Sequence, residues 1–518
     1  MLSTIYPISF TVCLVALIAW FYFKNNAALS KVFGIAFFGG LATYLVSIYL
    51  ADAETSYKLM VVARDLAIIG GVGYFFGMIA ENKLVFFAFL AMLYGALQYK
   101  FTEVLENTFP EKITCDFPAA GNSDDNSIEL LVELKPGFEA ESLEDFAQGF
   151  SLKIAYAFSP EDKEITDLDD YVTVDIPDNK LVAIKNIVSL LEVHPAVEWV
   201  EQNDVYQLDV LETIPQKRAP RDLKKFGLND PNLKDLWGFQ EMQVDALYTY
   251  LKKNKITPKE KANIFILDTG VDAKHEDLKA NYKSLNSRDD KDPMGHGTHC
   301  AGIAAAVSNN GIGVASFSQN NEFVTVTSIK VLGSHGGGTQ QGILKGIIKA
   351  ADNGAEVISM SLGGRTGDKG QKAYQQAIEY ANKKGAIVIA AAGNSNDNAK
   401  FYSPANAPGA ITVSALDPDL NRAVFSNYIQ EVDYGIAAPG VNIYSSIPGN
   451  KYASFNGTSM ATPYVAGLVG LMKSVRPDLT TKQAHDILSK TGNKTGNTKE
   501  TGPFIQPAKA VKMVVEMK

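Results

Sequence analysis

Cysteine is scarce in this chain, which contains only Cys13, Cys115 and Cys300 in 518 residues. The three lie far apart and in different sequence contexts, so the sequence does not predict a disulfide framework. Basic residues are also outnumbered, with 48 Lys and Arg against 57 Asp and Glu, and the formal net charge is -9. No basic stripe is present in the sequence, and we therefore expect no nucleic-acid partner.

Charge is rare in the first hundred residues, where Leu, Ile, Val, Phe, Ala and Gly dominate. Four apolar runs occur there, at 4–23, 32–50, about 60–80 and 84–97. A membrane helix needs about 20 residues, so residues 1–100 predict about four transmembrane helices. The fourth run is short, and the third contains Arg64 and Asp65. A cleaved signal peptide would explain the first run alone, but three more follow it and no small-residue cleavage pattern ends it.

Positive charge between the apolar runs predicts the topology. Lys24, Lys31 and Lys83 lie in the first and third loops, which favours a cytoplasmic side for those loops. Lys58 and Arg64 lie on the opposite side and make the asymmetry small. We expect a multi-pass protein in the lipid bilayer, with the rest of the chain outside the cytoplasm.

A polar linker at 101–126 is followed by a small predicted domain at 127–208. Strand-like runs occur at 128–134, 152–158, 171–176 and 197–208, with helix-like runs at 141–150 and 180–191. The resulting βαββαβ order is the split βαβ arrangement, a ferredoxin-like α+β fold with two helices on an antiparallel sheet. Such a fold does not imply a function, and the domain could be any small binding module.

Several later runs read as buried parallel strands that end in polar residues. The fully apolar run at 264–267 ends at Asp268, and the run at 386–392 leads to Asn394. Sites of open α/β sheets lie beyond the carboxyl ends of the strands, so these side chains are candidates for one site. Taken alone, each residue would more simply be explained as a turn residue.

Ser459 lies in the segment GTSMATP, a small-residue turn that opens an alanine- and glycine-rich helix. A serine hydroxyl is a weak nucleophile, and it needs a base, a group that orients the base, and oxyanion donors. His296 in the glycine-framed segment GHGTHCAG is the candidate base, whereas we interpret His299 as structural. Asp268 is the candidate orienting group, and the Asn394 amide with the Ser459 N–H would supply the donors.

Three motifs, DTG at 268–270, GHGTHCAG at 295–302 and GTSMATP at 457–463, follow in the order Asp, His, Ser and resemble the subtilisin family, from about 228 to 511. The resemblance implies a triad in which Asp268 supports His296 and His296 takes the proton from Ser459, with Asn394 in the oxyanion hole. It also implies a doubly wound, mostly parallel α/β sheet, protein or peptide substrates and no organic cofactor. Chymotrypsin-like enzymes and α/β-hydrolases place the same groups in other orders, and a Gly-x-Ser-x-Gly elbow is absent.

The same resemblance assigns further residues. Substrate binding is assigned to Gly336, Gly337, Gly338, Ser361, Leu362 and Gly363. We expect strand addition of extended substrate and a preference for apolar or aromatic side chains. Asp277 and Asn310 match ligands of a structural calcium site, and their oxygen ligands suit a hard cation, although the N-terminal ligand is not evident. Cys300 is typical of the proteinase K-like branch and is expected to be a packed thiol beneath the histidine.

The end of the small domain, VEWVEQND at 197–204, resembles the final strand of propeptide inhibitor domains that precede subtilisin-like proteases. In that family the propeptide assists folding, and its C-terminal tail lies in the active-site cleft. The alternative is a spacer domain. Residues 209–227 then form a processing linker, and self-cleavage there would release the peptidase domain at 228–518 from the membrane region.

The sequence therefore predicts a membrane-anchored serine endopeptidase that is made as a zymogen. The competing hypothesis is a catalytically silent membrane sensor whose protease-like domain only binds peptides, but such a protein usually lacks a triad residue and this chain lacks none. A processing protease with a narrow substrate is a third hypothesis, although no acidic cluster that would select dibasic sites is present.

Overall fold

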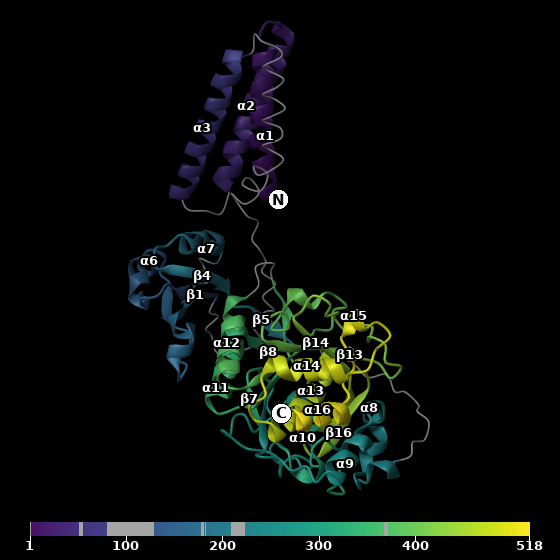
Figure 1. Ribbon diagram of the computed structural model, residues 1–518. Coiled ribbons are helices and arrows are strands. Elements are labelled where there is room, and N and C mark those ends of the chain that lie inside the picture. The colour runs from purple at the N-terminus through teal and green to yellow at the C-terminus, as the bar shows by residue number, and fades with distance from the viewer. Residues whose placement is uncertain are drawn as a thin grey trace. The chain divides into compact units, whose positions relative to one another are not determined.

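The computed structural model describes residues 2–50, 55–79, 129–177, 181, 183–208, 223–366 and 371–517. The chain forms two compact units, Met1–Ser123 and Asp124–Lys518, each of which is described by itself (Figure 1). Three predicted segments lie wholly or mostly outside the described residues: the fourth apolar run at 84–97, the linker at 101–126 and the processing linker at 209–227.

In the described part of the N-terminal unit, three helices lie where the first three apolar runs are predicted. They are α1 (Leu2–Tyr22), α2 (Ala27–Leu50) and α3 (Thr55–Ile79). Among the residues described, one helix, Ala27–Tyr49, is long and apolar enough to cross a membrane, and Ser9–Tyr22 is a shorter apolar helix. By length and composition this part of the chain supports one candidate span, whereas the sequence predicts about four.

The small domain has the predicted element order. Its elements are β1 (Leu130–Leu134), α6 (Glu144–Phe150), β2 (Lys153–Tyr156), β3 (Tyr171–Asp175), α7 (Ile184–Glu192) and β4 (Val197–Gln202). The strands form a sheet in the order β2-β3-β1-β4, and every pair is antiparallel. Leu130, Val132 and Val172 of the sheet pack against Ile187 and Leu191 of α7, because the apolar face of this amphipathic helix lies on the sheet.

The prediction of one closing strand at 197–208 is wrong. Strand β4 ends at Gln202, and a separate strand, β5 (Val205–Gln207), pairs with β8 (Gly337–Thr339) of the larger domain. At the break the chain turns to α11: the Asn203 Oδ1 accepts a hydrogen bond of 2.8 Å from the Gln341 N–H, and the Asp204 carbonyl accepts one of 2.7 Å from the Gln340 N–H. A contact between residues so far apart in the chain cannot be seen in a local alternation pattern.

The larger domain is built on a parallel sheet of six strands in the order β14-β13-β11-β9-β6-β7. These strands are β6 (Ala262–Asp268), β7 (Val324–Lys330), β9 (Val357–Met360), β11 (Ile387–Ala391), β13 (Ala410–Leu416) and β14 (Tyr434–Pro439). The strands are almost fully buried because helices cover both faces. The predicted α/β fold with a parallel sheet is confirmed.

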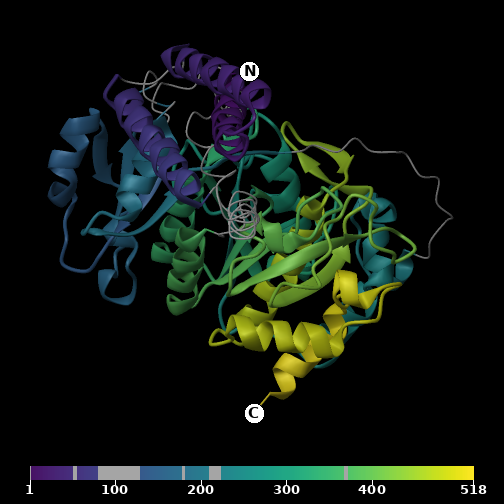
Figure 2. The same ribbon diagram turned by 90° about the horizontal axis from the view of Figure 1, so that it is seen from above.

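Two layers of helices complete the larger domain. One core contains α10 (His296–Ala305) and α13 (Thr458–Val475), and the other contains α11 (Gln340–Asp352) and α12 (Lys372–Lys383), which lie side by side in Figure 2. The remaining elements are α8 (Trp237–Glu241), α9 (Val244–Lys253), β10 (Gly364–Arg365), β12 (Tyr402–Ser403), β15 (Ile443–Ile447), β16 (Lys451–Phe455), α14 (Thr481–Thr491), α15 (Thr498–Thr501) and α16 (Pro507–Glu516).

Candidate active site

The carboxyl ends of three neighbouring central strands carry the polar residues that the sequence singled out. Strand β6 ends at Asp268, β9 is followed by Ser361, and β11 leads to Asn394. Two helices begin at the same edge, since His296 is the first residue of α10 and Ser459 is the second residue of α13. Segments from five places in the chain therefore converge at one edge of the sheet.

Asp268 and His296 are in direct contact. The His296 Nδ1 lies 2.8 Å from Oδ1 and 2.9 Å from Oδ2 of Asp268, and both side chains are buried. The approach requires glycine at 297, because a Cβ there would lie 2.1 Å from the carbonyl oxygen of Gly270. Burial, the largest single effect, lowers the pKa of His296, but the charge of Asp268, its hydrogen bond and the nearby Cys300 together outweigh burial and hold that pKa well above its usual 6.5.

A buried carboxylate that the sequence did not single out orders the start of α10. Asp292 accepts hydrogen bonds of 2.8 Å from the Gly295 N–H, 2.8 Å from the Thr298 N–H and 2.7 Å from the Thr298 hydroxyl. These contacts satisfy N–H groups at the helix N-terminus and place a negative charge there. Asp292 thus positions His296. The feature of the sequence that could have indicated this role is an aspartate shortly before a helix that has glycine at its N-cap.

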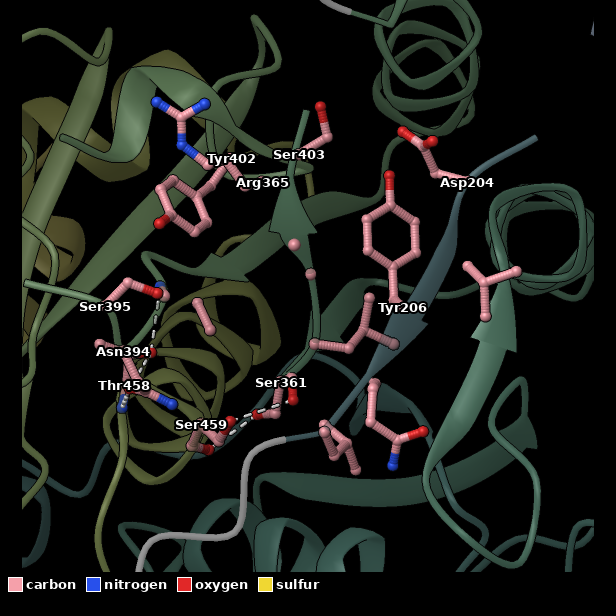
Figure 3. A pocket seen from close by; sticks show the side chains of 18 residues that line it. Asp204, Tyr206, Ser361, Arg365, Asn394, Ser395, Tyr402, Ser403, Thr458 and Ser459 are labelled. Atoms are coloured by element: carbon pink, nitrogen blue, oxygen red, sulfur yellow. Dashed lines mark hydrogen bonds between the residues drawn. The ribbon is translucent and has the colours of Figure 1, made fainter. Parts of the chain in front are cut away.

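Ser459 is held at the start of α13 by contacts with β9 and α10. Its hydroxyl donates a 3.1 Å hydrogen bond to the Ser361 carbonyl rather than to His296 (Figure 3). The backbone carbonyl of Ser459 accepts a hydrogen bond of 2.8 Å from the Ser361 hydroxyl and one of 3.5 Å from the Cys300 Sγ. Because that Sγ also lies 4.0 Å from the His296 Nδ1, Cys300 brings the histidine and the serine segment together.

The Cys300 thiol is fully enclosed, and burial raises its pKa. It is therefore a packed thiol, as the sequence predicts. Asp268, His296 and Cys300 present metal-ligating atoms within 4.8 Å of one another. The His296 Nδ1 that such a metal would need is already bonded to Asp268, so this geometry favours proton transfer chemistry over metal binding.

The Asn394 amide is oriented by Thr458. The Asn394 Oδ1 accepts hydrogen bonds of 2.9 Å from both the N–H and the hydroxyl of Thr458, whose Oγ1 in turn accepts 3.2 Å from the Gly393 N–H. This leaves the Asn394 Nδ2 as the donating end, and both this atom and the Ser459 backbone nitrogen lie close to Gly457. Thr458 was not singled out in the sequence because nothing local connects it to Asn394.

A cavity of about 430 Å³ lies beside Ser459 and Asn394. Three of the predicted substrate-binding residues, Ser361, Leu362 and Gly363, line it (Figure 3). The other three, Gly336, Gly337 and Gly338, lie along β8 and its approach, against β5. Tyr402 also lines the cavity, although its sequence neighbourhood offered no signal for this role.

The tail of the small domain occupies the cleft next to this cavity. Strand β5 pairs antiparallel with β8, with Tyr206 opposite Gly338, and the Leu208 N–H donates a 3.1 Å hydrogen bond to the Gly336 carbonyl. Residues 204–208 line the same cavity as Ser459. An extended segment thus adds a strand to the edge that the sequence predicts for substrate.

Polar side chains before β5 contact the first turns of α11 and α12. Glu201 Oε1 accepts a hydrogen bond of 2.6 Å from Gln340 Nε2, and Asp204 Oδ2 accepts one of 2.6 Å from Gln371 Nε2. Burial raises the pKa of Glu201 to about 7 and that of Asp204 to about 6. The small domain is therefore docked through carboxyl groups that burial holds toward the protonated form.

The predicted calcium ligands lie together, and neither lines the cavity beside Ser459. Asn310 Nδ2 donates a 2.8 Å hydrogen bond to Asp277 Oδ1. Asp230, which the sequence did not single out, is buried and accepts from the N–H groups of Asn309 and Asn310. Burial first, and then the nearby charge of Asp230, raise the pKa of Asp277 to about 7. Neither carboxylate forms an ion pair with a Lys or Arg of the described chain.

Known proteins resemble the part of the chain that contains this site. The model of the subtilase family matches residues 259–504. Thermitase of Thermoactinomyces vulgaris is 47% identical over 220 residues, covering 41% of this chain and 75% of the relative. Subtilisin DY of Bacillus licheniformis is 42% identical over 240 residues, covering 45% and 84%.

A third relative aligns over a longer stretch. An alkaline protease of Alkalihalobacillus alcalophilus is 32% identical over 377 residues, covering 72% of this chain and 89% of the relative. That aligned stretch is longer than the whole segment at 228–518, so it extends toward the N-terminus beyond the predicted peptidase domain.

Proposed function

The chain belongs to the subtilase family and is a serine endopeptidase, and from this premise we propose that Asp268, His296 and Ser459 form its catalytic triad. The observation that carries the proposal is the buried Asp268–His296 hydrogen bond of 2.8 Å beside the Ser459 segment. A histidine oriented in this way presents its other ring nitrogen for proton transfer.

In the proposed reaction the Ser459 hydroxyl turns from the Ser361 carbonyl toward His296, which accepts its proton. The oxygen attacks the substrate carbonyl carbon, and His296 then protonates the leaving amine as the acyl-enzyme forms. Water, activated by the same imidazole, attacks the ester and frees the serine. Asn394 Nδ2 and the Ser459 N–H would hold the oxyanion, and one such donor contributes about 2.7–4 kcal/mol, a figure that comes from a subtilisin.

A Ser459→Ala variant of the full chain tests this mechanism. The unaltered chain should process itself and react with a serine-directed phosphonate, whereas the variant should stay uncut and unlabelled. Ser395→Ala is the matched control, because Ser395 is an exposed serine that also lines the cavity. Equal self-processing by the chain and by Ser459→Ala would refute the triad and favour a silent, peptide-binding domain.

We also propose that residues 127–208 are an intramolecular inhibitor and that the enzyme is made as a zymogen. The pairing of β5 with β8 supports this, because a segment in the substrate position excludes substrate. The alignment that reaches beyond the peptidase domain is a second support. Self-cleavage would fall within 209–227, and N-terminal sequencing of the product is the direct measurement; a product that begins elsewhere would contradict the site.

The N-terminal unit is proposed to anchor the zymogen in the bilayer, with the four predicted spans and an extracytoplasmic peptidase domain. Its support is the apolar composition of the first hundred residues and the candidate span Ala27–Tyr49. Assignment to the proteinase K-like branch stays a proposal that depends on Cys300. A reporter fused after Lys518 tests the topology, and cytoplasmic reporter activity would overturn it.

A structural calcium ion is proposed between Asp230, Asp277 and Asn310. Two buried carboxylates without a basic partner in the described chain fit a divalent cation, provided that the Asn310 amide turns its oxygen toward the site. A bound ion stabilises the folded state by mass action. Removal of calcium with a chelator should speed heat inactivation, and an unchanged rate would contradict the site.

The preference for apolar or aromatic side chains beside the scissile bond is kept as part of the proposal. Leu362, Ala391 and the Tyr402 ring line the cavity next to Ser459, which supports an apolar subsite. Digestion of a peptide library by the mature enzyme measures the preference, and a majority of cuts after charged residues would contradict it.

A further inference from the structure

Tyr206 fills a closed subsite in the cleft. It is the middle residue of β5, it is 4% exposed, and its ring makes an edge contact with Tyr374 at 6.3 Å between centroids. The ring lies so close over Gly364 that a Cβ at that position would be 2.6 Å from its Cδ1. The subsite therefore has the shape of an aromatic ring, and Gly364 makes room for it.

The floor of this subsite carries a hydrogen-bond acceptor, and the Tyr374 hydroxyl beside it also interacts with the Tyr206 hydroxyl. The Tyr206 hydroxyl donates a 2.7 Å hydrogen bond to Gln371 Oε1, at the N-terminus of α12. Gln371 Nε2 donates a hydrogen bond of 2.6 Å to Asp204 Oδ2 and one of 3.0 Å to Gln340 Oε1. Both hydrogens of the Gln371 amide nitrogen are therefore donated to Asp204 and Gln340. The amide oxygen of Gln371 is then the atom that faces the Tyr206 hydroxyl.

The orientation of Gln371 does not depend on the small domain alone. Asp204 would leave with the propeptide, but Gln340 belongs to the peptidase domain and keeps its hydrogen bond to Nε2. Oε1 therefore continues to face the subsite in the mature enzyme. An acceptor in a closed subsite favours an occupant with a donor and is left unsatisfied by phenylalanine or leucine.

We propose that the mature enzyme selects substrates with tyrosine in the place of Tyr206, and that Gln371 determines this specificity. The proposal rests on the peptidase function proposed above, because it assumes that a substrate strand binds in the same position and register as β5. Residue by residue, a substrate in that register would place its tyrosine opposite Gly338, and two residues further on its N–H would bond Gly336.

Paired quenched peptides test the proposal. Both carry the sequence 203–212 of this chain, and they differ only in tyrosine or phenylalanine at position 206. We expect the self-processed enzyme to cleave the tyrosine peptide with a kcat/KM about twofold to tenfold higher, the effect of one net hydrogen bond. In Gln371→Leu the two peptides should be cleaved equally, at the rate of the phenylalanine peptide.

Gln376→Leu is the matched control, since Gln376 also lies on α12 but bonds Glu133 of the small domain at 2.8 Å. It should keep the preference for tyrosine. Phosphonate labelling of each variant reports that the fold and the serine are intact. Equal kcat/KM for the two peptides in the unaltered enzyme would overturn the proposal, as would failure of a labelled enzyme to cut or bind either peptide; an unlabelled enzyme would instead refute the proposed function.

Discussion

His296 shows how opposing effects on one residue set a functional property. Its burial disfavours the charged imidazolium, whereas the Asp268 carboxylate at 2.8 Å favours it, and the net pKa lies well above 6.5. His299, one turn further along α10, has no such partner: it stacks on Phe455, its Nε2 lies 3.0 Å from the Ala453 carbonyl, and burial lowers its pKa to about 3. The prediction that His299 is structural is confirmed.

The raised pKa of His296 predicts an alkaline enzyme. A general base must be neutral, so kcat/KM should rise with pH and reach its half-value above pH 6.5. Asp268→Asn removes the charge that raises this pKa, and the half-value of the residual activity should therefore move to lower pH. A kcat/KM profile of the mature enzyme measures both effects. A half-value at or below 6.5 in the unaltered enzyme would contradict the argument.

At the scale of secondary-structure elements, β4 and β5 join the small domain to the starts of α11 and α12. The contacts combine strand pairing with β8 and carboxyl groups that receive hydrogen bonds from Gln340 and Gln371. Glu133 of β1 adds a 2.6 Å ion pair with Lys372. Several carboxyl groups thus face one lysine and the partial positive charge of two helix N-termini.

The pKa values at this interface predict that docking of the cleaved small domain depends on pH. A carboxyl whose pKa is raised on docking stabilises the complex fully below its free pKa, which is 4.5 for Glu201 and 3.8 for Asp204. This contribution is lost as the pH rises through about 7 for Glu201 and about 6 for Asp204. The cleaved domain should therefore dissociate at least about tenfold more readily at pH 8 than at pH 5.

Glu201→Gln keeps the shape of the side chain and removes its ionisation, so it should flatten this pH dependence. Glu198 is an exposed residue of the same strand β4, so Glu198→Gln should leave the pH dependence unaltered. Size-exclusion chromatography of the self-cleaved chain at the two pH values measures the retained fraction. Equal retention of the unaltered domain at both values, or tighter retention at pH 8, would contradict the argument.

At the scale of the whole molecule, the chain order gives self-cleavage a second consequence. The apolar helices and the small domain both precede 209–227, and the peptidase domain follows it. A cut there would separate the peptidase domain from its proposed inhibitor and from its proposed anchor at the same time. If the proposed anchor holds, the affinity that remains between the cleaved parts would determine how long the enzyme stays at the membrane.

Cell fractionation tests this order of events. The unaltered chain should yield a soluble fragment that begins within 209–227, and Ser459→Ala should remain uncut in the membrane fraction. Activity found wholly in the membrane fraction, as an uncut chain, would contradict release. An uncut Ser459→Ala chain in the soluble fraction would contradict the anchor.

The sequence alone determined the α/β fold and pointed to Asp268, His296, Asn394 and Ser459, because buried strands, glycine-framed turns and small-residue helices are encoded by neighbouring residues. It also predicted about four membrane spans, of which the described residues support one candidate by length and composition.

Only the tertiary structure decided which groups orient these residues. Asp292 meets the start of α10, Thr458 turns the Asn394 amide, Asp230 joins Asp277, and Gln371 meets Tyr206 across 165 positions of the chain. It also divided the predicted closing strand at Asn203. The physical reason is that such contacts join segments far apart in the chain, and they exist only once the sheet and both helix layers have assembled.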